Sequence, residues 1–220
     1  MKLNSYFPNF IDEIKLEDHK ININYDKNKF NIKGKGNILL EDKLDNLSYQ
    51  IIKDKKNLRF NSTVNLNNNS LVISFLDYEK KENLNSLVLI KGNFKKNNQL
   101  SLDLINLKEK NNEILIEGLE LSQNFKIIDI KNFDINYRNN KKILNKINLK
   151  KDNSDFIIEG DSFDASKIIN TIMNNDEENS SIFKNLNSKF NIRIKKTYID
   201  KINYLNNLFG SIKYDNNKIK

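Results

Sequence analysis

Apolar and polar residues alternate along most of this chain with a period of two. Ile21, Ile23 and Tyr25, for example, are separated by asparagines. This period places one set of side chains on one face of a β-strand and the other set on the opposite face. Polar clusters such as 53–57 and 67–69 separate the runs and are typical of tight hairpin turns. The pattern therefore predicts a meander of antiparallel strands with short connections.

The period changes once along the chain. Ala165, Ile168, Ile169, Ile172 and Met173 recur at spacings of three and four, which indicates one face of an amphipathic helix. The chain is predicted to form a single elongated β domain over 13–220, with an irregular segment at 1–12, a strand meander at 13–160, a helix at 163–174, a loop at 174–181 and closing strands at 182–220.

A smaller irregularity lies before residue 131. Phe125 and Ile127 share one parity, whereas Ile128 and Ile130 share the other. A β-bulge is predicted here, because one extra residue returns the apolar set to the correct face.

Strands with one apolar face need something to cover that face, and one helix is too small to cover a dozen strands. The sheet must close on itself, fold into a sandwich or bind a ligand. We therefore predict an all-β, mainly antiparallel fold, an elongated curved sheet or taco-like groove with one short helix. The residues predicted to line the groove and bind lipid are Ile21, Ile23, Phe30, Ile32, Leu58, Phe60, Val64, Ile73, Phe75, Ile90, Phe94, Ile114, Ile116, Phe133 and Ile135.

The charge of the chain changes this interpretation little. Its net charge is +8, but only Arg59, Arg138 and Arg193 among its 37 basic residues are arginine. Readers of phosphate and guanine rely on the arginine fork. The lysines are also spread over turns and alternate strand positions, where they protect edges and solvate one face. No nucleic-acid partner is predicted.

A Gly160-Asp161-Ser162 triplet at the strand-to-helix junction resembles the nucleophile block of the GDSL esterases. That chemistry needs a general base and oxyanion donors. The sole histidine, His19, lies far upstream, and the Asp-x-x-His pair of that family is missing. Ser162, or alternatively Asp164, is instead predicted to cap the helix. The protein is predicted not to be an enzyme.

Metal and saccharide sites are not predicted either. The chain has no cysteine and one histidine, which excludes thiolate and multi-histidine metal sites. The run Asp152, Ser154, Asp155 lacks the glycine and the closing glutamate of a calcium loop. Asp129 and Asp134 could be proposed as a glycosidase pair, but no tryptophan platform accompanies them. No cofactor is expected.

The junction and the tail together resemble the AsmA-like cell-envelope family, in particular its large members related to YhdP and TamB. The pattern Phe156-x-x-x-Gly160-x-x-Phe163-Asp164-Ala165 is followed by Ile168 and Ile169 in the helix. The tail carries the strand Phe190–Ile194, the segment 198–208 and then Gly210-Ser211-Ile212-x-Tyr214, which is similar to the closing hairpins of that family.

The resemblance implies a curved β-groove with apolar residues inside, in a bridge-like lipid-transfer protein of a Gram-negative-type bacterium. It implies phospholipids as the partners, with other envelope proteins as further candidates, and a role in outer-membrane biogenesis. It also implies a periplasmic location with an anchor in the inner membrane. No apolar run of about 18 residues is present, so we expect that anchor outside this chain.

Two alternatives remain open. A structural or adhesive β protein could bind a protein partner by strand addition. An outer-membrane barrel shares the alternation, but the internal helix, the many strand lysines and the lack of aromatic girdles disfavour it.

Overall fold

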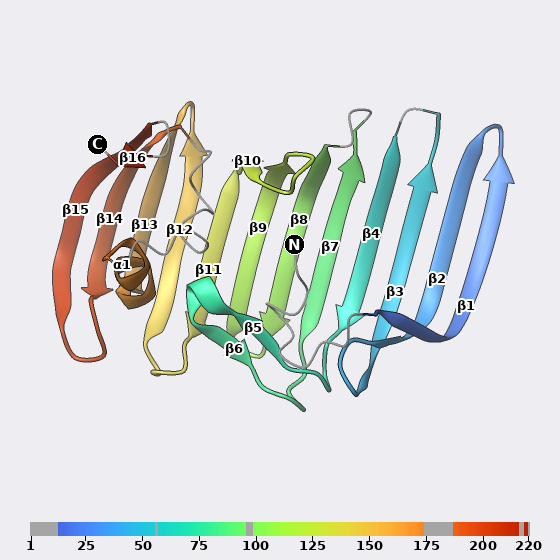
Figure 1. The fold of residues 1–220 in the computed structure, drawn as a ribbon, viewed down its shortest axis with the longest axis horizontal. Helices are drawn as coiled ribbons and strands as arrows, with labels where there is room; N and C mark the ends of the chain where they lie inside the picture. Colours follow the sequence, from blue (N-terminus) through green and yellow to red (C-terminus); the bar gives the residue numbers. More distant parts are fainter. Residues whose placement is uncertain (1–12, 56, 96–98, 174–186, 216–217, 220) are drawn as a thin grey trace.

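The structure is a computed structural model that describes residues 13–55, 57–95, 99–173, 187–215 and 218–219. Within these residues the chain forms one 14-stranded sheet and a separate two-stranded sheet (Figure 1). The elements are β1 (Lys15–Asp26), β2 (Lys29–Leu39), β3 (Leu44–Lys53), β4 (Leu58–Asn65), β5 (Leu71–Ile73), the 3-10 helix η2 (Ser74–Leu76), β6 (Tyr78–Lys80), β7 (Leu87–Phe94), β8 (Leu100–Glu109), β9 (Asn112–Leu121), β10 (Ile127–Asp129), β11 (Asn132–Arg138), β12 (Leu144–Asp152), β13 (Asp155–Asp164), α1 (Ser166–Met173), β14 (Lys189–Tyr198), β15 (Tyr204–Asp215) and β16 (Lys218–Ile219).

Strand order in the large sheet follows the chain, apart from the β5–β6 insertion and β10, which pairs only with β9. Consecutive strands pair because their connections are short. The β1–β2 turn illustrates the chemistry, since Lys27 and Asn28 both have positive φ, 44° and 68°. Two-residue hairpins need this left-handed backbone to match the strand twist. The predicted all-β, mainly antiparallel fold with one short helix is confirmed.

One pair of neighbouring strands is parallel, which the alternation alone did not indicate. β13 and β14 run side by side in the same direction, and α1 lies in the connection between them. The helix falls inside the predicted span, and Asp164 supports its start because one of its carboxylate oxygens accepts the Ser166 backbone N–H at 3.0 Å. Ser162 lies within β13 and is not the cap. The predicted loop at 174–181 and the segment 1–12 fall outside the described residues.

The segment between β4 and β7 corrects the predicted meander. Residues 67–69 are not a tight turn between two strands of the main sheet, because β4 pairs directly with β7. The intervening chain leaves the sheet and forms a hairpin, β5–η2–β6, whose strands pair only with each other. Ile73 and Phe75 therefore belong to this hairpin and not to the wall of the sheet.

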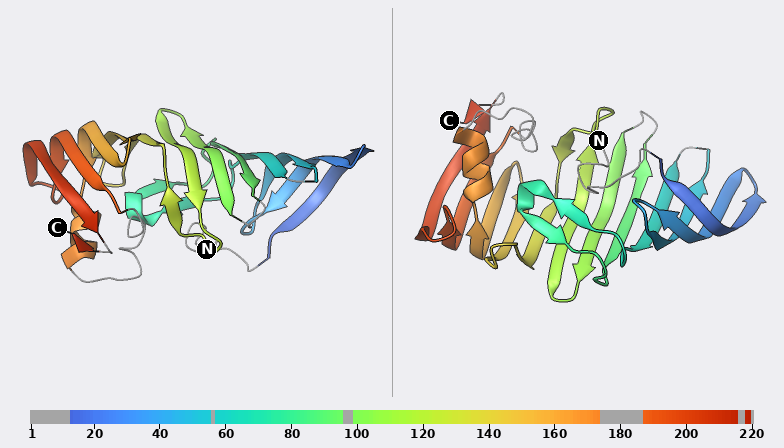
Figure 2. Two further views of the ribbon diagram at one scale, coloured as in Figure 1. Left: turned by 90° about the horizontal axis from the view of Figure 1, so that it is seen from above. Right: turned by 60° about the horizontal axis from the view of Figure 1, so that its bottom comes forward.

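The sheet is open, because β1 lies at one end of the strand order and β15 and β16 at the other. It twists along its length, and both α1 and the β5–β6 hairpin lie on the same side of it (Figure 2). The Lys167 ammonium and the Asp77 carboxylate, 3.0 Å apart, connect the helix to the hairpin. The hydrophobic core lies between the hairpin and the sheet and continues along the sheet to β14.

The predicted bulge before residue 131 is confirmed. The pairing of β10 with β9 shifts register between Ile127 and Asp129. Ile130 is consequently buried with the core, while Ile128 faces solvent.

Candidate ligand-binding face

One face of the large sheet is apolar from β1 to β15. The register defines a row of directly opposed residues, one from each strand of the large sheet except β10 and β16, which we call the central row. Opposed residues of neighbouring strands project their side chains to the same face. Within the central row, only the Ser62 side chain and the Tyr49 hydroxyl are polar. Its members are Ile21, Gly34, Tyr49, Ser62, Ile90, Ile105, Ile116, Phe133, Leu149, Ile158, Ile192 and Gly210.

The other predicted lining residues on the main sheet flank this row on the same face. Ile23, Ile32 and Phe60 belong to one parallel row of opposed residues. Phe30, Leu58 and Phe94 form another row, and Val64, Ile114 and Ile135 a third. Thirteen of the fifteen predicted residues thus share one face, and the other two, Ile73 and Phe75, pack against the same core from the hairpin.

Exposure of this face changes along the sheet. Toward β1 it is open, with Ile23 61%, Tyr25 60% and Ile21 55% exposed. In the middle it is closed, since Ile135 has 0% exposure and Ile114 has 3%. Large apolar residues left open to water in one contiguous area mark a binding surface.

The hairpin closes the middle of the face. Tyr78 of the hairpin and Tyr137 of β11 meet edge to face, with ring centroids 5.3 Å apart. The Tyr78 hydroxyl donates to Glu109 at 2.7 Å, and the Tyr137 hydroxyl donates to the Leu76 carbonyl. Burial raises the pKa of both tyrosines above the ordinary range, so both are neutral in the folded protein.

A buried polar cluster anchors the hairpin to the β2–β3 end of the sheet. One Asp45 oxygen accepts the backbone N–H groups of Asn67 and Asn68, both at 2.8 Å, and the other accepts the Asn69 side-chain amide at 2.8 Å. The fully buried Lys80 ammonium donates to the carbonyls of Asn67 and Asn69. Burial lowers the pKa of Lys80. These bonds satisfy the polar backbone where the chain leaves the sheet.

A second cluster holds the start of α1. The buried Asp164 carboxylate accepts the Asn139 side-chain amide at 2.8 Å and pairs with the Lys141 ammonium at 2.9 Å. The Lys141 ammonium also donates to the Ser166 hydroxyl at 2.6 Å. Although burial opposes its charge, hydrogen bonds from Ser166, Lys141 and Asn139 lower the pKa of Asp164. All these groups are occupied in fixing the helix.

The esterase hypothesis finds no support in this geometry. Ser162 is buried in β13, whereas His19 lies on β1 at the far end of the strand order. The Nε2 atom of His19 is 2.8 Å from the Asn37 carbonyl oxygen. The serine and the histidine therefore cannot form a nucleophile–base pair.

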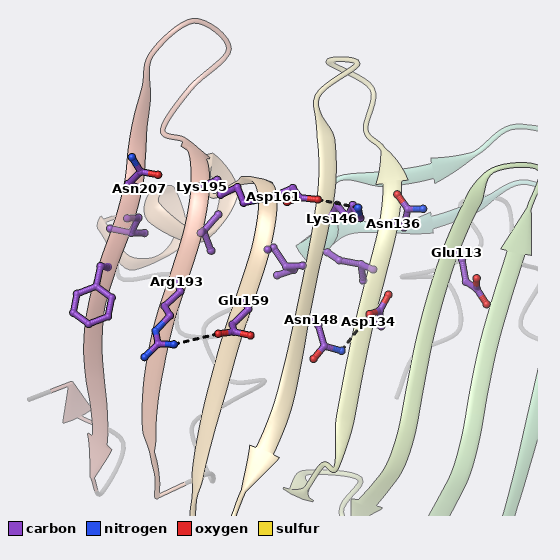
Figure 3. A pocket seen from close by; sticks show the side chains of 16 residues that line it. Glu113, Asp134, Asn136, Lys146, Asn148, Glu159, Asp161, Arg193, Lys195 and Asn207 are labelled. Carbon is purple, nitrogen blue, oxygen red and sulfur yellow. Dashed lines mark hydrogen bonds and ion pairs between the residues drawn. The ribbon is translucent and has the colours of Figure 1, made fainter.

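The opposite face of the sheet is polar and carries an open hollow of about 720 Å³ over β9 and β11–β15 (Figure 3). The Asp161 carboxylate lies between two ammonium groups. Its oxygens are 2.8 Å from Lys146 Nζ and 2.7 Å from Lys195 Nζ. Hydrogen bonds from these two ammonium groups lower the pKa of Asp161 to about 2. Arg193 and Glu159 pair at 3.5 Å beside it. The charges compensate one another, so the hollow has the character of a solvated strand face.

In the described part of the chain, no group of three or more His, Cys, Asp or Glu side chains is placed to hold a metal ion. Among the described helices, none is long and apolar enough to cross a membrane.

Sequence reasoning missed two features of the surface. The hairpin cover was not anticipated, because Leu71–Ile73 alternates just as the sheet strands do. The exposed turn between β14 and β15 was also missed, although Ile199 and Ile202 among its polar residues were a visible signal.

The fold and this face define the class, an open all-β protein with one apolar face that is covered only in part. No family model, curated protein or solved structure matches this chain. The likeness to the AsmA-like family therefore rests on the residues quoted for it and stays a prediction.

Proposed function

We propose that this chain is a non-enzymatic lipid-binding segment whose apolar face takes up the acyl chains of phospholipids. The observation that carries the proposal is the central row, which runs apolar from β1 to β15 and is open at the β1 end. Burial of each methylene group is worth about 0.8 kcal/mol relative to water. An acyl chain that lies across the strands gains this burial free energy for each of its methylene groups in contact with the face. Such binding requires no catalytic group.

The open end also suits a lipid with a polar head. Ile21, Ile23 and Phe30 provide apolar contact, while Lys53 opposes Phe30 in the register and stands at the end of β3 on the same face. Lysine can place its stem on apolar surface and its ammonium near a phosphate. Phospholipid is therefore favoured over a ligand that is apolar throughout.

The wider role extends this proposal. In the cell envelope of a Gram-negative-type bacterium, such a face would carry phospholipids between the inner and outer membranes. This part rests on the resemblance around Phe163-Asp164-Ala165 and in the tail, and the local lipid-binding proposal does not depend on it.

Lipid binding can be tested with a strand whose two faces are both accessible. Ile21→Asp with Ile23→Asp places charge on the apolar face of β1. Asn22→Asp with Asn24→Asp adds the same charge to the polar face of that strand and is the matched control. Binding of a fluorescent phosphatidylglycerol should fall at least about tenfold in the first variant and stay unchanged in the control. Equal binding by both variants, or no binding by the parent, would contradict the proposal.

A second candidate is strand addition, and the specific observation behind it is the β1 edge. β1 has 12 residues and pairs only with β2 among the described strands. Its exposed edge is blunted by a register shift between Glu17 and Lys20, with Asp18 at a φ of 51°. Native mass spectrometry after mild extraction separates the two candidates. Co-purifying phospholipid supports lipid binding, and a stoichiometric bound polypeptide in its place supports strand addition.

A further inference from the structure

The turn between β14 and β15 exposes an unusual concentration of apolar side chains. Ile202 is 81% exposed and Ile199 is also exposed, as are Tyr204 and Leu205, the first two residues of β15. The turn lies at the lower ends of β14 and β15 in Figure 1, and α1 does not extend over it. A solvated turn is normally polar, so these residues need a separate explanation.

The turn has a defined conformation. One oxygen of Asp200 accepts the backbone N–H groups of Ile202 and Asn203, both at 2.7 Å, and the other accepts the Asn203 side-chain amide at 2.7 Å. These hydrogen bonds, led by those from Asn203, lower the pKa of Asp200. The Ile199 backbone N–H donates to the Asn203 carbonyl at 2.9 Å. The carboxylate is thus engaged within the turn, and Ile202 is held outward.

Cationic and aromatic groups lie directly behind this apolar tip. The Lys196 ammonium is 3.8 Å from the ring centroid of Tyr204 and 4.9 Å from that of Tyr198. Within the described residues, Lys196, Lys201 and Lys142 form no ion pair. Lys142 belongs to the β11–β12 turn, which projects from the same edge of the sheet (Figure 1).

We infer that the β14–β15 turn inserts into the interfacial region of an anionic phospholipid bilayer. Ile202 and Leu205 enter the apolar boundary of the bilayer. Tyr198 and Tyr204 lie at the level of the head groups, where their amphipathic rings are favoured. Lys196 and Lys201 meet the lipid phosphates, and each surface lysine adds attraction to an anionic leaflet.

The size of the tip favours a bilayer over a protein partner. A stable protein interface buries about 800 Å² on each side. A single turn with a few projecting side chains supplies much less area, whereas bilayer insertion needs only a few apolar anchors backed by cations. The inference uses residues distinct from the open end of the apolar face, so each proposal can fail without the other.

The test is flotation of the whole chain with vesicles of phosphatidylcholine alone or mixed with phosphatidylglycerol. The parent should float with the mixed vesicles, more weakly with phosphatidylcholine, and less at high salt. Ile202→Asp should weaken flotation at least about tenfold, because it removes the main apolar anchor and adds a repelled charge. Ile128→Asp makes the same change at an exposed position away from this turn and should float as the parent does.

Lys196→Gln should weaken flotation with the mixed vesicles and leave the weaker flotation with phosphatidylcholine unchanged. The variant with Ile21→Asp and Ile23→Asp should float normally even if it no longer binds single lipids, which keeps the two proposals distinguishable. Failure of the parent to float, equal loss in Ile202→Asp and Ile128→Asp, or a change of oligomeric state in Ile202→Asp in place of lost flotation would each overturn the inference.

Discussion

The middle and the β1 end of the sheet share one pattern of residues and differ in what lies over it. Ile135 on β11 and Ile23 on β1 occupy the same face of regular strands, yet one is fully buried and the other is mostly exposed. The difference comes from the β5–η2–β6 hairpin, which closes the middle and leaves the β1 end uncovered. Alternation thus determines which face a residue takes, and inserted elements determine whether that face is core or surface.

The largest effect should come from truncating this face at its two extremes. Ile135→Ala leaves a cavity under the hairpin, and we expect it to lower the free energy of unfolding by about 4 kcal/mol. Ile23→Ala removes the same atoms from an exposed site, and we expect a loss under about 1 kcal/mol. Urea denaturation of both variants measures the contrast. Similar losses would show that the β1 end is also tightly packed in solution.

The next effect should come from detaching the cover. Asp45→Ala leaves the backbone N–H groups of residues 67–69 without their acceptor, and we expect a loss of about 2–3 kcal/mol. The middle of the face should then behave as the β1 end does and bind an apolar fluorescent dye more strongly. Asp42→Ala changes an exposed carboxylate before the same strand and should alter neither property. Unchanged dye binding in Asp45→Ala would mean that another contact holds the hairpin.

A smaller effect should appear only at alkaline pH. Tyr78 and Tyr137 have pKa values raised by burial, so above about pH 10 they ionise when unfolded and stay neutral when folded. Each of these tyrosines therefore lowers the free energy of unfolding by about 1.4 kcal/mol for every pH unit above about pH 10, so stability falls as pH rises. Tyr78→Phe and Tyr137→Phe should each flatten this dependence.

Denaturation at a series of pH values from neutral to alkaline measures the slope. Tyr25→Phe, at the open β1 end, is the matched control. An equal slope in the parent and in Tyr78→Phe would contradict the structure of the covered region.

The sequence pattern predicted which face of the sheet is apolar, but it did not predict the hairpin that covers the middle of that face. The period of two placed thirteen of the residues predicted to line the groove on one face of the sheet. It could do so because a strand has only two faces, and alternating polar residues assign the apolar ones to one of them. The parity switch at Ile127 and Ile128 located a bulge for the same reason. Ile73 and Phe75 were misplaced because local alternation is identical in a sheet strand and in a detached hairpin. Long-range contacts distinguish the two, such as the bonds of Asp45 to residues 67–69 and the bond of Tyr137 to Leu76.

The alternation also did not predict the parallel pairing of β13 and β14, because that pairing depends on where the chain returns to the sheet after α1. Strand direction across such a connection is a tertiary property. The Phe163-Asp164-Ala165 junction was visible, and Asp164 was one of its two cap candidates. Its buried bonds to Asn139 and Lys141 came from residues more than twenty positions away.

The smallest effect is expected where the face ends, at Gly210 of β15. A Cβ atom added there meets nothing within 4 Å, and the backbone has no positive φ. Gly210→Ala should therefore raise the free energy of unfolding by about 0.5 kcal/mol, because glycine loses more conformational freedom on folding. At Gly92, a Cβ atom would lie 2.4 Å from the Ser101 carbonyl oxygen, so Gly92→Ala should destabilise instead. If Gly210→Ala also destabilised the fold, something must cover the β15 end in solution, and the contrast between covered middle and open ends would hold only at β1.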